Sequence, residues 1–289
     1  MTNPFLDAVK RHVDNVLSQC RDGYGSENSP LLVDFFNPSS GEPGRWQEEL
    51  QSSAGAKYGP LRITSNFALQ QSFLRTLQGL AELTGRRRYR DAADEWVGYA
   101  LPTLQDPVSG LLYWGGHATY DLKENEPVIG CHEMKCVYPD YGAFYLVDPE
   151  RARLMVEGFW ERHVHDWSNL LFNRHGAYDG KKLRAGTDGF WERTFEGGDL
   201  PIIENESLSF INTGGDLIMA GTLLSNQSGD PAPMTWARRL LVQFDRIRHP
   251  DTLLGGYQIN HREPCRVRVS FKHPLNQEKE VNETTGLGR

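Results

Sequence analysis

Apolar residues recur along most of the chain at the three- and four-residue spacing of amphipathic helices. The first run opens with the pair Asn3-Pro4, in which the asparagine suits a helix cap and the proline suits the first turn. With Phe5 and Val13 on one face, this run predicts a helix that ends near Arg21. The N-terminal pattern is therefore that of an amphipathic helix and lacks the apolar core of a leader peptide.

Two further helical patterns follow in the first half of the chain. One runs from Thr64-Ser65 to Leu83, carries Leu77 on its apolar face and stops before Gly85, a residue that commonly terminates helices. The next covers Tyr89–Leu104. The remaining helices are predicted at Tyr141–Val147, Pro149–Leu170, Glu206–Ser225 and Met234–Arg248.

Pairs of helices alternate with short segments that contain glycine and an aromatic residue. These segments recur at intervals of about seventy residues, beginning near Asp106, Asn173 and His249. The stretch 23–60 is rich in Gly, Ser and Pro and is too punctuated for long regular elements. One helical hairpin cannot bury its apolar face alone, so neighbouring hairpins must stack around a ring.

This pattern predicts a mainly α fold. We expect an α/α toroid, that is, an incomplete α/α barrel of stacked helical hairpins, with short β-like turns at the rim of a cleft. Residues 1–273 are predicted to form a single catalytic domain and residues 274–289 a disordered tail.

Composition narrows the function classes. A net charge of −7 argues against an extended nucleic-acid surface, and no apolar stretch approaches the length of a membrane-spanning helix. The four cysteines show no CxxC pairing and demand no disulfide. We therefore expect neither a nucleic-acid nor a membrane partner, and the absence of an apolar leader predicts a cytoplasmic protein.

Three glycine-containing loops hold the candidate metal ligands. They are His117 after Gly115-Gly116, Glu133 after Gly130, and His175 before Gly176. Two imidazoles and one carboxylate suit a divalent transition metal, Mn²⁺, Ni²⁺, Co²⁺ or Zn²⁺, better than Ca²⁺, which prefers oxygen ligands. Since the three lie far apart in the sequence, their convergence has to be assumed. A lone histidine is more often a hydrogen-bonding residue than a ligand, and this alternative remains open.

The order His117, Glu133 and then the pair Arg174-His175 resembles the active site of family 2 polysaccharide lyases, which are pectate lyases built on an α/α barrel. The resemblance is strongest over residues 111–178. It implies that His117, Glu133 and His175 hold a transition metal and that Arg174 abstracts a proton. Members of the family are about twice this length, so we expect a fragment, a compact relative or a homologue with a changed activity.

Other residues are candidates for binding an acidic sugar chain. Lys135 either neutralises a substrate carboxylate or simply faces solvent. Lys181 and Lys182 form a basic patch with Arg184, which either receives neighbouring uronates or belongs to a plain exposed loop. Trp114 and Tyr113 either stack on sugar rings or fill the rim of the cleft.

The proton abstraction itself leaves a choice open. An arginine is almost never deprotonated, so an equally physical alternative has Arg174 clamping the uronate while water or Lys135 takes the proton. Away from these loops, His163 and His165 are interpreted as charges favourable to a helix C-terminus.

The sequence therefore predicts a lyase that cleaves pectate or oligogalacturonate by metal-assisted β-elimination, with an acidic polysaccharide or oligosaccharide as its partner. One alternative is an α/α-toroid glycoside hydrolase or sugar epimerase with a carboxylate or histidine acid–base pair and no metal. For the hydrolase, Glu204 and Glu206 with Asp188 or Glu192 could supply the two carboxylates, although Glu204 and Glu206 equally suit the acidic first turn of a helix. Another is a non-catalytic protein that binds uronates through Arg174.

Overall fold

The structure is a computed structural model that describes residues 3–50, 57–178, 189–198, 209, 211–246, 248, 251–254, 267–272 and 278–283. The chain divides into two compact units that interleave along the sequence. Unit 1 comprises Met1–Asp106, Leu112–Glu133 and Ala143–Ala152, and unit 2 comprises Pro107–Leu111, Met134–Gly142 and Arg153–Arg289. The single domain expected for residues 1–273 stays a prediction.

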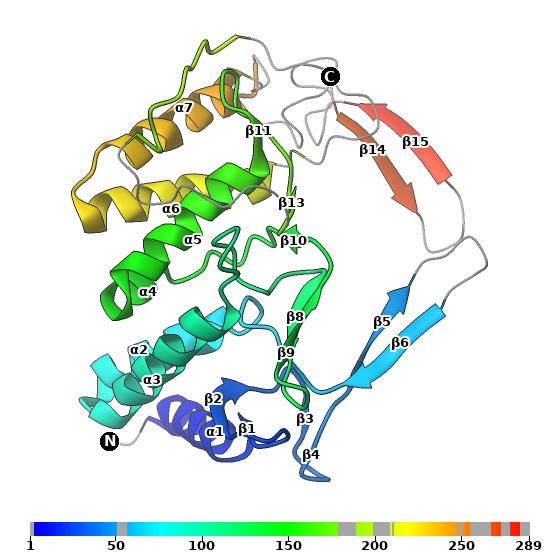
Figure 1. The fold of residues 1–289 in the computed structure, drawn as a ribbon, viewed down its shortest axis with the longest axis vertical. Helices are drawn as coiled ribbons and strands as arrows, with labels where there is room; N and C mark the ends of the chain where they lie inside the picture. Colours follow the sequence, from blue (N-terminus) through cyan, green and yellow to red (C-terminus); the bar gives the residue numbers. More distant parts are fainter. Residues whose placement is uncertain are drawn as a thin grey trace. The chain divides into compact units, whose positions relative to one another are not determined.

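Unit 1 is built around a helical hairpin. Helices α2 (Gln71–Thr84) and α3 (Arg87–Leu104) pack against each other (Figure 1), and α1 (Pro4–Gln19) precedes them in the chain. The turn between α2 and α3 contains Gly85, which adopts the left-handed conformation with φ 64°. The fully buried Leu77 and Trp96 form part of the core of this unit, as their helical periodicity predicts.

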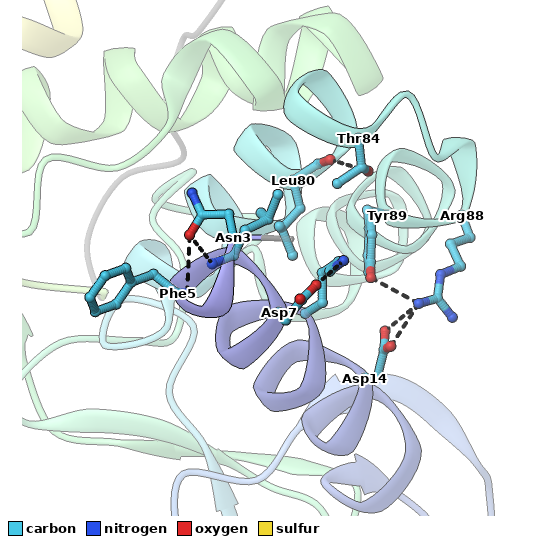
Figure 2. A network of polar contacts seen from close by, with 10 residues as sticks. Asn3, Phe5, Asp7, Asp14, Leu80, Thr84, Arg88 and Tyr89 are labelled. Atoms are coloured by element: carbon cyan, nitrogen blue, oxygen red, sulfur yellow. Dashed lines mark hydrogen bonds and ion pairs between the residues drawn. The ribbon is translucent and has the colours of Figure 1, made fainter. Parts of the chain in front are cut away.

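Polar contacts fix both ends of α1 (Figure 2). The side chain of Asn3 caps the helix by accepting hydrogen bonds from the backbone N–H groups of Phe5 and Leu6 at 3.1 and 3.3 Å. Near the other end, Arg88 of α3 reaches both carboxylate oxygens of Asp14 at 2.6 and 2.7 Å. This ion pair links α3 to α1.

Short antiparallel strands complete unit 1. Strand β7 (Thr64–Ser65) pairs with β8 (Ala118–Asp121), and β8 pairs with β9 (Glu126–Ile129) to form a three-stranded sheet. Strand β10 (His132–Glu133) follows. Two-stranded pairs make up the Gly/Ser/Pro-rich region: β1 (Arg21–Asp22) with β2 (Ser29–Leu32), β3 (Phe36–Asn37) with β4 (Glu42–Pro43), and β5 (Trp46–Leu50) with β6 (Lys57–Arg62).

Two predicted helix boundaries are wrong, in each case because a strand competes. The helix expected from Thr64 begins only at Gln71, since Thr64 and Ser65 pair with Asp121 and Tyr120 in the sheet. The helix expected to reach Leu170 ends at His163, where a strand takes over. Strand pairing involves residues distant in sequence, which local periodicity does not register.

Unit 2 holds most of α5 (Pro149–His163) and a second helical hairpin, α6 (Ile211–Ser228) with α7 (Ala232–Arg246) (Figure 1). Helix α4 (Tyr141–Val147), which begins in this unit, has the predicted bounds. The predicted start of α6 at Glu206 lies outside the described residues. The strands of this unit are β11 (Val164–Asp166), β12 (Leu171–Phe172), β13 (His175–Gly176), β14 (Val267–Lys272) and β15 (Glu278–Glu283).

Part of the expected C-terminal tail is a strand. Residues 278–283 form β15, which pairs antiparallel with β14. The other residues of the segment 274–289 lie outside the described part of the chain, so their predicted disorder stays a prediction.

A tryptophan cluster forms the core of unit 2. The rings of Trp167 and Trp236 meet edge to face with centroids 4.8 Å apart, and the indole N–H of Trp236 donates to the carbonyl of Trp191 at 2.8 Å. Arg193 lies over the ring of Trp167 at 4.6 Å. Across the described residues, no helix is both long and apolar enough to cross a membrane.

Candidate active site

His117 lies at the open end of the β8–β9 hairpin. In this antiparallel pair Ala118 faces Ile129, so the residue before Ala118 and the residue after Ile129 come together. The backbone of Gly130 indeed lies against that of His117, and a side chain at Gly130 would collide with the His117 carbonyl oxygen. The hairpin register therefore brings His117 beside the segment that leads to Glu133.

A second glycine makes the same close approach. Gly115 has a positive φ of 101°, and a Cβ at this position would lie 2.6 Å from the carbonyl oxygen of Glu133. The backbone on both sides of His117 thus lies against residues 130–133 without intervening side chains. Gly115 and Gly130, two of the glycines noted in the sequence, thus allow this close backbone approach.

Two predicted metal ligands meet in unit 1. The Nε2 of His117 lies 3.7 Å from the Oε2 of Glu133, and the glutamate is 2% exposed whereas the histidine is 52% exposed. Two bonds of about 2.1 Å each span this gap, so one divalent cation can contact both atoms. A ring nitrogen of His117 also lies within 4.8 Å of the Sγ of Cys131. His117 thus has a carboxylate oxygen and a thiol sulfur near its ring, and such donors suit a borderline transition metal.

Strand alternation separates His132 from this donor set. Along an extended backbone successive side chains point to opposite sides, so Cys131 and Glu133 share one side and His132 takes the other. His132 is fully buried, and its Nε2 accepts a hydrogen bond from the indole N–H of Trp114 at 2.7 Å. Trp114 itself is 2% exposed and packs against Phe67. Trp114 thus packs in the core of unit 1, and stacking on a sugar ring stays a prediction for it.

Tyr113, the other aromatic candidate, is half-buried. Its hydroxyl donates to the carboxylate of Asp106 at 2.8 Å, and burial together with this bond raises the pKa of the phenol.

The turn that carries Arg174 and His175 belongs to unit 2, and Asn173 shapes it. The Asn173 side chain accepts a hydrogen bond from the His175 backbone N–H at 2.9 Å, an Asx turn that orients the two following residues. The carbonyl of Arg174 accepts from the backbone N–H of Met134 at 2.9 Å. Both Arg174 and His175 are half-buried.

His163 is hydrogen-bonded to this turn. It is fully buried, and its Nδ1 lies 2.9 Å from the carbonyl of Asn173; because a carbonyl oxygen only accepts, Nδ1 carries the proton. Burial lowers the pKa of His163 to about 4, so the ring is neutral near neutral pH. The interpretation of His163 as a positive charge at a helix end is therefore wrong, because desolvation disfavours the imidazolium.

Lys135 is exposed on a segment that Asp216 of α6 holds in place. The buried Asp216 carboxylate accepts from the backbone N–H groups of Cys136 and Tyr138 at 3.0 and 3.2 Å. Both of these residues have positive φ values, 57° and 46°, so the carboxylate stabilises an unusual backbone path. Burial raises the pKa of Asp216 to about 6.

Several predicted site residues lie outside the described part of the chain. They are the basic patch Lys181 and Lys182 and the acidic residues Asp188, Glu204 and Glu206. Conversely, the structure adds Cys131, Asn66 and Asp216 to the surroundings of the predicted residues. Cys131 was within reach of sequence reasoning, since it alternates with Glu133, whereas Asn66 and Asp216 carry no local signal.

The chain is mainly α, and its glycine-rich loops carry a His/Glu donor pair and an Arg-His turn. These are the features on which the resemblance to pectate lyases was based, and comparison with known proteins tests it. The family described as "Periplasmic pectate lyase" matches residues 29–272, and the chain belongs to this family. The family inferred from residues 111–178 is thus confirmed, and the match extends well beyond them. One curated relative, a "Pectate disaccharide-lyase" from Dickeya dadantii (strain 3937), is 32% identical over 269 residues.

That alignment covers 89% of this chain and 46% of the relative, so the chain spans about half the length of the curated relative it matches. Among solved structures, the cellobiose 2-epimerase from Spirochaeta thermophila DSM 6192 matches with a TM-score of 0.50 and 15% identity, covering 94% of this chain and 62% of that one. This likeness is one of fold alone, and it confirms the predicted α/α-toroid class.

The cytoplasmic location expected from the sequence is wrong. The family is described as periplasmic, and that description overturns the expectation. The expectation depended only on the pattern of the N-terminal residues, which form α1.

Proposed function

We propose that this chain carries out metal-assisted β-elimination on an acidic polysaccharide or oligosaccharide, most specifically pectate or oligogalacturonate. The observation that carries the proposal is the 3.7 Å separation of His117 Nε2 and Glu133 Oε2 in a chain that belongs to a pectate lyase family. His117 and Glu133 hold a divalent cation (Mn²⁺, Ni²⁺, Co²⁺ or Zn²⁺), and His175 is proposed as the third ligand. Met134, the residue after Glu133, is hydrogen-bonded to Arg174, the residue before His175, which supports this choice.

In a uronate chain, elimination removes the proton at C5, forms a C4–C5 double bond and breaks the bond from C4 to the glycosidic oxygen, which leaves with a proton from solvent. When bound, the cation supplies Lewis acidity toward the uronate carboxylate, which makes the C5 proton more acidic. This step asks the protein for a base near C5 and for positive groups that orient the sugar carboxylates.

Arg174 is proposed as the group nearest the C5 proton, acting as its abstractor or as a clamp for the uronate carboxylate. In the clamp version Lys135 or water takes the proton, because a guanidinium gives up its own proton only at extreme pH. Two features support a common site for these groups. Asn173 orients Arg174 through the Asx turn, and the bond from Met134 to Arg174 places the segment with Lys135 next to that turn.

The test is incubation with polygalacturonate, with and without a chelator and added Mn²⁺, while following ultraviolet absorbance of the unsaturated product and the release of reducing ends. Metal-dependent growth of both signals is expected. Reducing ends without the absorbance identify a glycoside hydrolase instead, and silence in both with retained binding identifies a uronate-binding protein. Arg174→Lys keeps a single positive charge and loses the bidentate guanidinium, so the clamp version predicts a raised KM for polygalacturonate in this variant.

A further inference from the structure

The side chain of Asn66 bonds to the backbone on both sides of His117. Its Nδ2 donates to the carbonyl oxygens of Gly115 at 2.7 Å and Ala118 at 3.3 Å, and its Oδ1 accepts from the backbone N–H of Gly115 at 3.1 Å. Asn66 is 6% exposed, so these bonds are shielded from competing water. The amide of Asn66 thus links the two ends of the short loop that carries the His117 imidazole.

The orientation of Asn66 is itself imposed by the half-buried carboxylate of Asp34. The backbone N–H of Asn66 donates to Asp34 Oδ1 at 2.7 Å, and the same oxygen accepts from the Gln70 side chain at 3.0 Å. The second oxygen of Asp34 accepts from the Thr64 hydroxyl at 2.8 Å. A carboxylate with this many donors has one stable orientation, so Asn66 starts from a rigid base.

The opposite side of the loop is equally confined. Gly115 lies against the backbone of Glu133, and Gly130 lies against the backbone of His117. The loop is therefore held between the amide of Asn66 and the segment that carries Glu133. If the amide is removed, the loop loses three hydrogen bonds on one side and keeps only its backbone contacts on the other.

We propose that Asn66 is a positioning residue that sets the His117 imidazole at the distance from the Glu133 carboxylate at which one cation reaches both. The inference rests on the proposed function, because it assumes that this pair holds a metal. The chemistry of the amide explains the residue type, since only Asn or Gln offers two donors and an acceptor in one plane. Aspartate at this place keeps the acceptor and loses both donors.

The experiment compares Asn66→Ala with Ser29→Ala in the full chain. Ser29→Ala is the matched control because it removes a buried hydrogen bond, to Asp22 in the same unit, and leaves Asp34 and the three bonds to the loop in place. Thermal unfolding reports whether each variant folds. Co²⁺ affinity from calorimetry and the visible Co²⁺ spectrum report the donor set, and amide hydrogen exchange at Gly115 in the metal-free protein reports the loop directly.

We expect Asn66→Ala to bind Co²⁺ at least about tenfold more weakly, with an altered spectrum, which is the range seen when an outer partner of a metal ligand is lost. Its Gly115 amide is expected to exchange at least about tenfold faster, while Ser29→Ala stays within about twofold of the wild type in both measurements. If the alanine variant does not fold, Asn66→Asp takes its place with the same expected outcomes.

A folded Asn66 variant with unchanged Co²⁺ affinity, spectrum and Gly115 exchange overturns the inference. If the wild type itself binds no Co²⁺, the proposed metal site fails, and Gly115 exchange alone then decides whether Asn66 holds the loop. The failure of the proposed function and the failure of this inference are therefore distinguishable.

Discussion

The Nδ1 of His163 lies 2.9 Å from the carbonyl oxygen of Asn173, and the Nε2 side of the same imidazole lies against the backbone of Gly176. The end of α5 thus supports the turn that presents Arg174 and His175. The buried, neutral ring donates a hydrogen bond to this turn and also packs closely against it, and both properties lead to predictions.

The close packing of His163 against Gly176 predicts the effect of adding a single methyl group. In Gly176→Ala the new Cβ would lie 2.8 Å from His163 Nε2, so either the ring or the turn must move. We expect a loss of about 1–3 kcal/mol in the free energy of unfolding, measured by denaturant titration, together with reduced activity on polygalacturonate. Gly198→Ala is the matched control, because a Cβ there meets nothing within 4 Å. Equal stability of the two variants would contradict the close contact.

The neutral ring predicts a pH dependence of stability. Because the pKa of His163 is lowered to about 4 from about 6.5, the unfolded chain binds more protons than the native one between these values. Stability is therefore expected to fall as pH falls from about 6.5 through about 4, by on the order of 3 kcal/mol from this group. His163→Gln should flatten this part of the profile, whereas the exposed His165→Gln should leave it unchanged. A wild-type slope in His163→Gln would exclude His163 as its source.

Asp216 is predicted to act through the segment that carries Lys135. Asp216→Asn replaces one acceptor oxygen with an NH₂ group that faces a backbone N–H, which costs about 1–3 kcal/mol and loosens the left-handed residues Cys136 and Tyr138. We expect the KM for polygalacturonate to rise by about threefold or more. Asp230→Ala, which removes a cap at the start of α7, should cost about 1 kcal/mol of stability without raising KM. An unchanged KM in Asp216→Asn would refute this role.

Glu133 is predicted to dominate metal affinity within unit 1. Glu133→Gln keeps the shape of the side chain and removes its charge, so Mn²⁺ and Co²⁺ should bind at least about tenfold more weakly in calorimetric titrations. The exposed Glu124→Gln serves as the control for the loss of one negative charge nearby in the sequence. Equal affinities in the two variants would remove Glu133 from the proposed donor set.

Much of the helical structure was predictable because helical periodicity is local. The predicted α4 bounds agree with the structure, and α1 and α3 agree to within about two residues. The start of α2 and the end of α5 were mispredicted because Thr64-Ser65 and Val164–Asp166 join strands, and their partners lie elsewhere in the chain.

The loops were identified from residue type, and glycine was the most informative signal. Gly115, Gly130 and Gly176 each lie where a Cβ would collide with the backbone or ring of another segment. The orientation of Trp114 was not predictable, because its place in the core depends on His132 and Phe67, which contact it only in the folded chain.

By itself the sequence determined a mainly α protein with histidine, glutamate and arginine on glycine-rich loops, since these properties depend on spacing and side-chain chemistry. Only the tertiary structure decided which groups hold those loops. Asn66 bonds to Gly115 across 49 residues and Asp216 bonds to Cys136 across 80, and neither position carries a local pattern. The physical reason is that buried polar groups must find partners wherever the packed chain brings them, whereas periodicity records only neighbours along one element.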